Sequence, residues 1–355
     1  MPAAWDLAVQ QSRDTWLYHM SGMGPLFRPP GSGPLTFVEC RRDGKLVGGA
    51  ILVVTQYRWH RFWQRQYAKG FIGPMSVSPF VIGGLGARVF EGVWQRVVEG
   101  CVAAAQSMRC DELLLHDTVQ SLACLEDRPL VNRYVTSPQW RPELCYDYVI
   151  DLRQDRDVLF KNLETRCRTS IRRAREQFQV VGGTDIDNGR QIHVDLMETV
   201  YRREGMKLVG RDGLLEIWDK VYGGGFGRAF FSVLDGKPCT FTGVTRFGSV
   251  ASYQHAARSE EAPSGAAALG LWSAIEWAKS EGVVWFDCNG ALFETSGRER
   301  QRAISLFKRG FGGQVVQVHG ARRQFRPLAR ATCDFIDAWG VQAKGLLRKA
   351  SSFHR

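Results

Sequence analysis

The same order of four predicted elements occurs twice in the chain, and this internal repeat restricts the fold more than any other feature. In each copy two apolar runs flank the tripeptide Asp-Gly-Lys, at 43–45 and at 235–237. Such a tripeptide between apolar runs predicts a β-hairpin with a tight turn. Each copy continues with a helix and a strand that leads to an aspartate, Asp117 or Asp287. We therefore expect two related α/β domains with mixed sheets, joined near Tyr146–Leu152.

The repeat also sets the domain boundaries. We expect the first domain over residues 1–148 and the second over 149–320, followed by a basic C-terminal segment, 321–355. The second domain has additional helices before its hairpin. They are predicted over Asp155–Gln177, Val194–Arg203 and Leu214–Tyr222.

Positive charge is concentrated in two stretches of the chain. Residues 161–175 carry six Lys or Arg against one Glu, and residues 320–355 carry eight against two Asp, which together account for the formal net charge of +11. Concentrated charge favours a polyanionic partner. On a helix, Arg168, Arg172 and Arg175 fall on one face, so we expect them to bind RNA or another phosphate-bearing partner. The alternative is a solvated basic face.

A second basic region alternates with aromatic residues. Between residues 57 and 69 five aromatic side chains and a histidine lie among Arg and Lys, including Arg65 and Lys69. Aromatic rings that stack on bases, together with cations, suit single-stranded RNA ends such as a tRNA acceptor stem. The same composition also fits an exposed hairpin that packs on a protein partner.

The composition excludes several classes of protein. With 44% apolar and 23% charged residues the chain is typical of a soluble globular protein. No apolar run approaches the roughly 20 residues that span a bilayer, and the N-terminus lacks a signal-peptide pattern, so we expect a cytoplasmic location. The nine cysteines form no C-x-x-C motif, and no Cys/His cluster has zinc spacing. We therefore expect reduced thiols and no metal site.

Three motifs together resemble the FemAB family. Phe-Asp-Cys-Asn-Gly at 286–290, followed by Phe-Lys-Arg-Gly-Phe-Gly-Gly at 307–313, is similar to the end of the second domain in that family. The pattern Arg-x-Arg-x-x-Ile-Arg-Arg-Ala at 166–174 resembles its basic helix, and Gly-Pro at 73–74 resembles the end of a hairpin in its first domain. The resemblance extends from about Thr36 to Gly320.

The resemblance implies a fold and a reaction. The fold is a tandem pair of GNAT-like domains, in the short form of the family that lacks a long helical arm. The reaction is transfer of an aminoacyl group from aminoacyl-tRNA, as co-substrate and without a further cofactor, to an amine of a diphosphate-bearing peptidoglycan precursor or a related acceptor. It further implies that segment 321–355 returns to the first domain, and it allows contact with a membrane surface.

The resemblance also assigns candidate residues for the acceptor. The loop after the second predicted helix offers Lys207 and Arg211 where the family places a phosphate-binding arginine. We add Asp117, Tyr253 and His255 as acceptor-binding candidates, His255 because it lies where some members have a tyrosine. The family's N-terminal phosphate-binding lysine has no counterpart here.

The catalytic candidates are Asp287 and Lys308. Aminoacyl transfer needs removal of a proton from the amine and stabilisation of an oxyanion on the ester carbonyl. We assign the cationic role to Lys308, which lies between phenylalanines, and the role of base or amine-orienting group to Asp287, although a purely structural cap is an alternative. A nucleophilic Cys288 is not favoured, because buried cysteine is common and His255 lies on another predicted strand.

An acyl-CoA donor is the main alternative to aminoacyl-tRNA. GNAT enzymes bind the pyrophosphate of coenzyme A at a helix start that carries a Q/R-x-x-G-x-G/A motif. The equivalent stretch is 262–267, Ala-Pro-Ser-Gly-Ala-Ala, with Ala262 in the Q/R position. A second hypothesis is therefore an acyl-CoA N-acyltransferase acting on an envelope or polysaccharide precursor. A third is a catalytically silent protein that binds RNA or assists envelope assembly.

Overall fold

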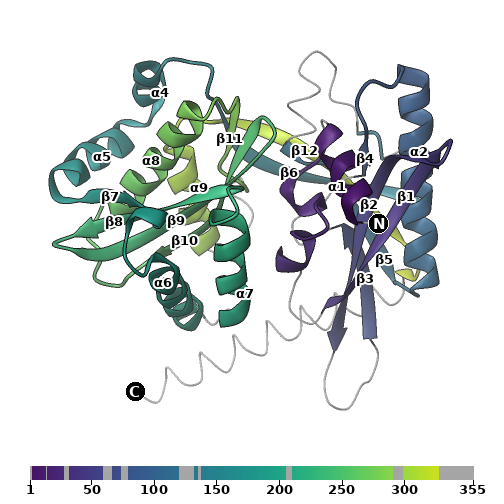
Figure 1. Ribbon diagram of the computed structural model, residues 1–355, viewed down its shortest axis with the longest axis horizontal. Helices are drawn as coiled ribbons and strands as arrows, with labels where there is room; N and C mark the ends of the chain where they lie inside the picture. Colours follow the sequence, from purple (N-terminus) through teal and green to yellow (C-terminus); the bar gives the residue numbers. More distant parts are fainter. Residues whose placement is uncertain are drawn as a thin grey trace.

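Two lobes share one continuous β-sheet (Figure 1). The computed structural model describes residues 2–12, 14–27, 32–58, 66–72, 79–119, 132–134, 137–204, 210–290 and 299–327. Within these residues the strand order is β1-β2-β3-β5-β12-β6-β11-β10-β9-β8-β7, and β4 pairs with β2. None of the described helices combines the length and apolarity required to cross a membrane.

Among its described residues the first lobe has a short N-terminal helix, two helical turns and a long helix, and both helices pack on the sheet. In chain order its elements are α1 (Pro2–Gln11), η1 (Leu17–His19), η2 (Gly24–Phe27), β1 (Ser32–Arg42), β2 (Lys45–Arg58), β3 (Gln66–Ile72), β4 (Phe80–Val81), α2 (Ala87–Ser107) and β5 (Glu112–His116). Helix α2 turns an apolar face, with Val93, Trp94 and Val97, onto the sheet because these residues recur at helical spacing.

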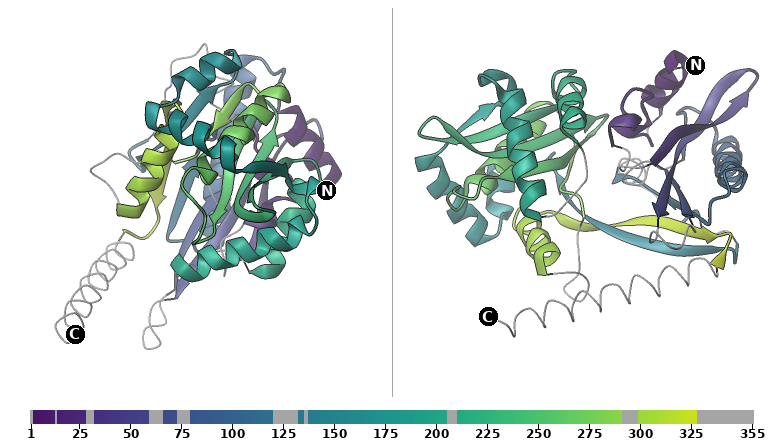
Figure 2. Two further views of the ribbon diagram at one scale, coloured as in Figure 1. Left: turned by 90° about the vertical axis from the view of Figure 1, so that its left-hand side faces the viewer. Right: turned by 90° about the horizontal axis from the view of Figure 1, so that it is seen from below.

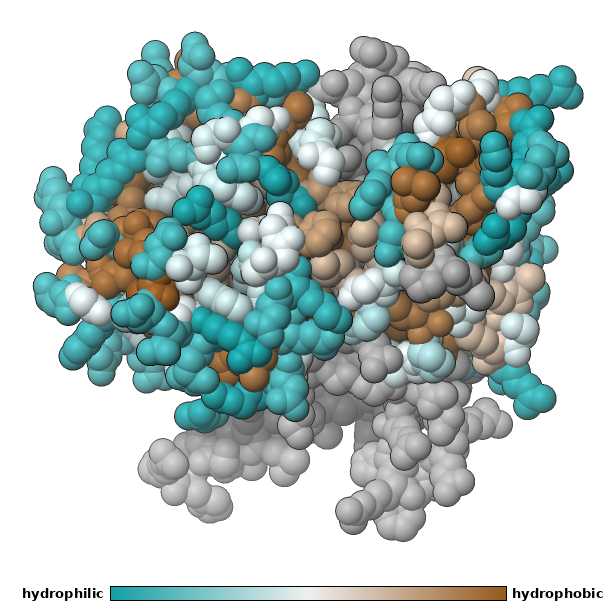
Figure 3. All heavy atoms as spheres, in the orientation of Figure 1, coloured by the Kyte–Doolittle hydropathy of each residue, from teal (hydrophilic) through white to brown (hydrophobic). Residues whose placement is uncertain are grey.

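The second lobe has helices on both faces of its strands. Its elements are α4 (Arg156–Asn162), α5 (Thr165–Gln177), β7 (Gln179–Gly182), η3 (Gly183–Asp185), α6 (Gly189–Glu204), α7 (Arg211–Ile217), η4 (Trp218–Tyr222), β8 (Gly227–Leu234), β9 (Lys237–Phe247), β10 (Val250–Arg258), α8 (Ala266–Ser280), β11 (Trp285–Asp287) and α9 (Glu299–Arg309). Hydrophilic side chains predominate on the face of this lobe that Figure 3 shows.

The predicted repeat is present in both lobes. The β1–β2 and β8–β9 hairpins turn at 43–44 and 235–236, where both central residues have positive φ, from 48° to 77°. That conformation defines the tight turn for which Asp-Gly is suited. In each lobe a helix then leads into a strand that pairs in parallel, β5 with β3 and β11 with β10. The prediction of a tandem α/β fold with mixed sheets is therefore confirmed.

Two long strands connect the lobes. β6 (Trp140–Asp151) and β12 (Gln314–Gln324) pair antiparallel, while β12 also pairs with β5 and β6 with β11. Both strands run between the lobes in Figure 2. Residues 321–324, the start of the predicted C-terminal segment, pair with β5 of the first lobe. Residues from 328 onward lie outside the described part of the chain.

The helical stretch expected over 155–177 is interrupted. It forms α4 and α5, with extended backbone at Leu163 and Glu164. The reason is tertiary: Leu163 is buried, and the N–H of Glu164 donates to the carbonyl of Gly310, 2.9 Å away. Helical spacing of the apolar residues would put Val158 on the buried face beside Leu159, but Val158 is 44% exposed.

Candidate active site

The candidate site lies where the pairing of β10 and β11 ends. The two strands pair only from Val250–Trp285 to Ser252–Asp287, after which β10 continues to Arg258. Just beyond, Gln254 is an extra residue on β10 opposite β9, which makes a β-bulge. The chain leaves β11 through Asn289, which has a φ of 57°. A bulge beside a strand end re-aims side chains toward a common point, so this is a suitable place for a reaction centre.

Asp287 is the centre of a hydrogen-bonded group at this point. It is only 4% exposed. One carboxylate oxygen, Oδ1, accepts the N–H of Asn289 at 2.6 Å, and Oδ2 accepts the hydroxyl of Ser252 at 3.3 Å. Burial and the nearby carboxylate of Asp147 raise the pKa of Asp287 well above its usual value, while the two hydrogen bonds and Lys308 oppose that rise.

Lys308 is held beside Asp287 by the backbone. Its ammonium donates to the carbonyl of Asn289, with Nζ and O 2.8 Å apart. It lies in the last turn of α9, and its neighbours Phe307 and Phe311 contact each other edge-on, with ring centroids 5.3 Å apart. Burial lowers the pKa of Lys308, while Cys288, Asp287 and Asp147 oppose that change. Phe311 is buried in the core of the second lobe, and Phe307 packs against the same cluster of side chains.

Glycine is required just after α9. Gly312 has a φ of +75°, and a Cβ there would clash with the backbone of Asn162 in α4. Only glycine combines this conformation with so close an approach. The second half of the Phe-Lys-Arg-Gly-Phe-Gly-Gly motif therefore packs α9 against α4 and fixes the direction from which Lys308 reaches the site.

Asp147 belongs to the site, and the sequence analysis missed it. It lies on β6, where it accepts the backbone N–H of Gly290 and interacts with Lys308. Burial raises its pKa. The site thus contains two carboxyl groups and one amine. The available signal was weak: Asp147 is one polar residue between two tyrosines of an otherwise unremarkable strand, and only pairing of β6 with β11 places it beside Asp287.

The predicted residues Tyr253 and His255 follow Ser252 on β10, and Cys288 follows Asp287 in the chain. The carbonyl of Tyr253 accepts the side-chain amide of Asn289 at 2.6 Å. His255 follows the bulge, and burial lowers its pKa to about 4, so it is neutral at pH 7. Cys288 is fully buried and its N–H donates to Tyr148, while burial raises the pKa of its thiol. Reactive cysteines have a lowered pKa and are partly exposed, so this buried thiol is a poor candidate for a nucleophile.

Two acceptor candidates make their described contacts elsewhere. Arg211, at the start of α7, binds Glu198 of α6 at 3.1 Å and Asp195 at 3.7 Å. Asp117, after β5, accepts the hydroxyl of Tyr134 at 2.8 Å, and burial raises its pKa. No contact among the described residues joins either one to Lys308. Lys207 and Arg65 lie outside the described residues, and for Lys69 the structure describes only the backbone, in β3.

The basic stripe on α5 is partly engaged within the lobe. Arg168 donates to the carbonyls of Lys161 and Leu163 at the end of α4. The guanidinium groups of Arg172 and Arg175 lie 5.6 and 5.4 Å from the ring centroid of Phe160. Arg175 also binds Glu276 at 3.4 Å. Arg168 therefore connects α4 and α5, whereas Arg172 packs against an aromatic ring and forms no ion pair with another described residue.

The start of α8 is covered by α5. Gly265, which caps this helix with a φ of +95°, approaches so closely that a Cβ would lie 2.9 Å from the carbonyl of Ser170 and 3.1 Å from Ala174. Ala266 is fully buried. A free helix start binds phosphate through its unpaired N–H groups. Here α5 packs closely against the residue that precedes the first turn of α8.

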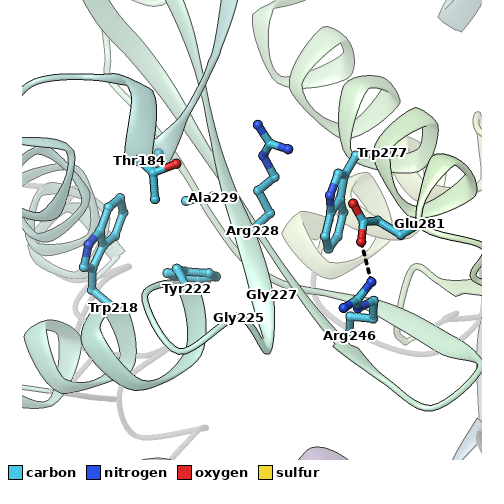
Figure 4. A pocket seen from close by; sticks show the side chains of 11 residues that line it. Thr184, Trp218, Tyr222, Gly225, Gly227, Arg228, Ala229, Arg246, Trp277 and Glu281 are labelled. Atoms are coloured by element: carbon cyan, nitrogen blue, oxygen red, sulfur yellow. Dashed lines mark hydrogen bonds and ion pairs between the residues drawn. The ribbon is translucent and has the colours of Figure 1, made fainter.

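A separate hollow lies beside the start of β8 and the end of β9 (Figure 4). It encloses about 310 Å³ between the rings of Trp218, Tyr222 and Trp277. Two arginines line it, but each is already bound by a carboxylate: Arg228 by Asp185 at 3.4 Å and Arg246 by Glu281. We do not include this hollow in the active site.

Comparisons with known proteins agree with this architecture. Residues 165–294 match the family model described as an acetyltransferase (GNAT) domain. The crystal structure of FemX superposes with a TM-score of 0.65 at 13% identity, covering 93% of this chain and 98% of that one. No curated protein matches the chain.

Two further structures superpose at similar length. One is the C-terminal domain of a putative lysylphosphatidylglycerol synthetase from Agrobacterium fabrum, with a TM-score of 0.55, 14% identity and coverage of 94% of both chains. The other is a conserved protein of unknown function from Bacteroides thetaiotaomicron, with a TM-score of 0.55, 12% identity and coverage of 91% and 96%. The chain thus has the GNAT acyltransferase fold, in the tandem form that the sequence predicted.

Proposed function

We propose that the protein is an aminoacyltransferase that moves an amino acid from aminoacyl-tRNA to an amine of a peptidoglycan precursor or a related acceptor. One observation carries this proposal: the ammonium of Lys308 is fixed by the Asn289 carbonyl beside the buried carboxyl of Asp287. A fixed cation and a carboxyl with a raised pKa are the two groups that ester aminolysis requires. The GNAT fold and the similarity to FemX support it.

Each group has a distinct role in the reaction. The attacking amine must lose a proton, and a base is most effective when its pKa is near the working pH. Burial and Asp147 move the pKa of Asp287 in that direction. As the amine attacks, negative charge develops on the ester carbonyl oxygen, and Lys308 stabilises it. The ester is already activated, so the reaction needs neither a covalent enzyme intermediate nor a cofactor.

We assign aminoacyl-tRNA as the donor. The start of α8 is packed against α5, and this packing argues against a coenzyme A pyrophosphate at this helix start. Cations on the second lobe suit the tRNA backbone instead. We assign tRNA binding to Arg172 and Arg175, while Arg168 holds α5 against α4. Arg65 and Lys69 are proposed to bind tRNA from the first lobe. A cytoplasmic location follows from this donor.

We assign a diphosphate-bearing amine as the acceptor. Lys207 and Arg211 are proposed for the phosphates, and Asp117, Tyr253 and His255 for the rest of the acceptor. Arg211 is bound by two carboxylates of α6, so its use requires exchange of those partners for phosphate. Tyr253 and His255 follow Ser252 closely on β10, which supports their assignment to the reacting amine.

The second candidate is an acyl-CoA-dependent N-acyltransferase. The match of residues 165–294 to an acetyltransferase domain favours it. One experiment separates the two: purified protein is incubated with a nucleotide-linked precursor peptide and either radiolabelled aminoacyl-tRNA from a mixed pool or radiolabelled acetyl-CoA. We expect label in the precursor from tRNA only, with loss of the signal in Asp287→Asn. Label from acetyl-CoA alone would contradict the proposal and support the acyl-CoA-dependent reaction. Label from neither donor would contradict both reactions and indicate a protein that binds its partners without catalysis.

A further inference from the structure

A chain of hydrogen bonds leads from the first lobe to Asp287. The hydroxyl of Tyr18, on η1, donates to the side-chain carbonyl oxygen of Gln254, the bulge residue of β10. The amide nitrogen of Gln254 donates to Ser252 Oγ at 3.0 Å, and Ser252 Oγ donates to Asp287 Oδ2 at 3.3 Å. Tyr18 and Gln254 are 236 residues apart in the sequence.

The direction of this chain is fixed by counting donors at Ser252. Its hydroxyl has one proton and two acceptor lone pairs. One lone pair accepts the amide of Gln254 and the other accepts the amide of Asn289, whose Nδ2 lies 2.9 Å away. Both partners are NH₂ groups and can only donate. The single proton of Ser252 must therefore point at Asp287.

Tyr18 sets which end of the Gln254 amide faces Ser252. A phenol proton directed at Oε1 holds the carbonyl end toward η1 and the NH₂ end toward Ser252. Burial raises the pKa of Tyr18, so the phenol remains a donor at every working pH. Without that donor the amide is free to turn, and a carbonyl facing Ser252 would draw the serine proton away from Asp287.

We infer that Tyr18 is a positioning residue of the second lobe's reaction centre, which acts through Gln254 and Ser252 to keep a hydrogen bond directed at the Asp287 carboxylate. The inference rests on the proposed role of Asp287 as the base. It gives the N-terminal turns of the first lobe a function, since they complete the active site of the other lobe. A hydrogen bond to the charged form of a carboxyl stabilises that form.

Other charged and titratable groups also face Asp287, and the test must leave them in place. They are Asp147 from β6, Lys308 from α9 and Cys288 from its own strand end, with Tyr18 approaching from η1. Tyr18→Phe alters none of the first three. A change in the titration of Asp287 in this variant is therefore attributable to the chain through Gln254 and Ser252.

The first measurement is the pH dependence of kcat/KM for aminoacyl transfer. Loss of the hydrogen bond should move the acid limb of Tyr18→Phe upward by about one pH unit. Gln254→Met interrupts the same chain at its middle and should give the same shift. Tyr222→Phe is the matched control, because it removes a buried phenol whose oxygen has no hydrogen-bond partner among the described residues. An unchanged limb in both Tyr18→Phe and Gln254→Met overturns the inference.

The second measurement does not depend on activity. Urea unfolding of Tyr18→Phe, Asp287→Asn and the double variant at pH 7 gives a double-mutant cycle. We expect non-additive free energies of unfolding for this pair, and additive ones when Tyr222→Phe replaces Tyr18→Phe. Additivity for both pairs overturns the inference. Full transfer activity in Asp287→Asn would instead overturn the proposed base, while the cycle would still decide whether the hydrogen-bond chain exists.

Discussion

The ammonium of Lys308 and the backbone carbonyl of Asn289 are 2.8 Å apart, and this one hydrogen bond joins α9 to the end of β11. Asn289 also donates its N–H to Asp287, so the same residue orients the cation and the carboxylate. Two groups of opposite charge are thus fixed relative to one another by a single turn with positive φ.

Replacement of Lys308 by methionine should abolish most of the activity without unfolding the protein. Methionine keeps the length and apolar stem of the side chain and removes the charge. Loss of a group that stabilises the oxyanion raises the activation free energy by about 3 kcal/mol. We therefore expect kcat to fall about a hundredfold while Tm changes little. Arg309→Met is the control, since its side chain is exposed and binds Glu164 on the surface. Unfolding of Lys308→Met would make the residue structural, and intact transfer would remove it from the mechanism.

Asp147 and Asp287 should be coupled in the pH profile. Asp287 acts as a base only when ionised, and its raised pKa places the acid limb of the rate above the usual carboxyl value of about 4. Because the charge of Asp147 contributes to that rise, Asp147→Asn should move the limb to lower pH. The control is Asp157→Asn, an exposed carboxylate on α4. A limb that stays in place or moves upward in Asp147→Asn would contradict the assignment.

Coenzyme A should not bind saturably. The first turn of α8 is packed against α5, and Ala262 occupies the position where acyl-CoA enzymes have Gln or Arg. Isothermal titration with acetyl-CoA at millimolar concentration should show no binding isotherm. A micromolar Kd would favour the acyl-CoA-dependent reaction over the tRNA-dependent one.

Arg172 and Arg175 should account for part of the salt dependence of tRNA binding. Each neutralised phosphate contributes to the slope of log K against log salt, so the double change to Gln should weaken binding and reduce that slope by one to two units, on the order expected for two contacts. Arg168 is left in place because it holds α4. Arg190→Gln, which removes a surface arginine bound to Asp219, is the control. An unchanged affinity and slope would identify the stripe as a solvated face.

The sequence predicts the repeat units well because their signals are local. Asp-Gly turns and the periodicity of α2 and α8 depend on neighbouring residues only, and these elements have the expected order. The break at Leu163 and Glu164 could not be predicted in this way, since it depends on the carbonyl of Gly310, which is far away in the sequence.

The candidate site was predictable only in part for the same reason. Asp287 and Lys308 lie in motifs and were found. Asp147 and Tyr18 carry no local signal, because one reaches the site through strand pairing of β6 and the other through packing of an N-terminal turn on the second lobe. A motif identifies residues close to one strand end, whereas groups that arrive from other elements require the fold.

The last prediction concerns stability in acid. His193 on α6 is fully buried among the rings of Trp218 and Phe241, and neither ring nitrogen has a hydrogen-bond partner among the described residues. Burial, with a smaller contribution from His255, lowers its pKa to about 3. In the unfolded chain a histidine has a pKa near 6.5, so the unfolded state binds the proton first as the pH falls.

Above pH 6.5, His193 is neutral in both states and does not change the free energy of unfolding. As the pH falls from 6.5 toward 3, the unfolded chain takes up the proton and the free energy of unfolding decreases. At pH 4.5, two units below the unfolded pKa, the loss is roughly 2–3 kcal/mol. His193→Phe keeps a ring that packs on Trp218 and cannot be protonated. In urea unfolding the variant should resemble the wild type at pH 7.5 and exceed it in stability at pH 4.5. Equal loss of stability in both proteins on acidification would show that His193 is not the group that titrates.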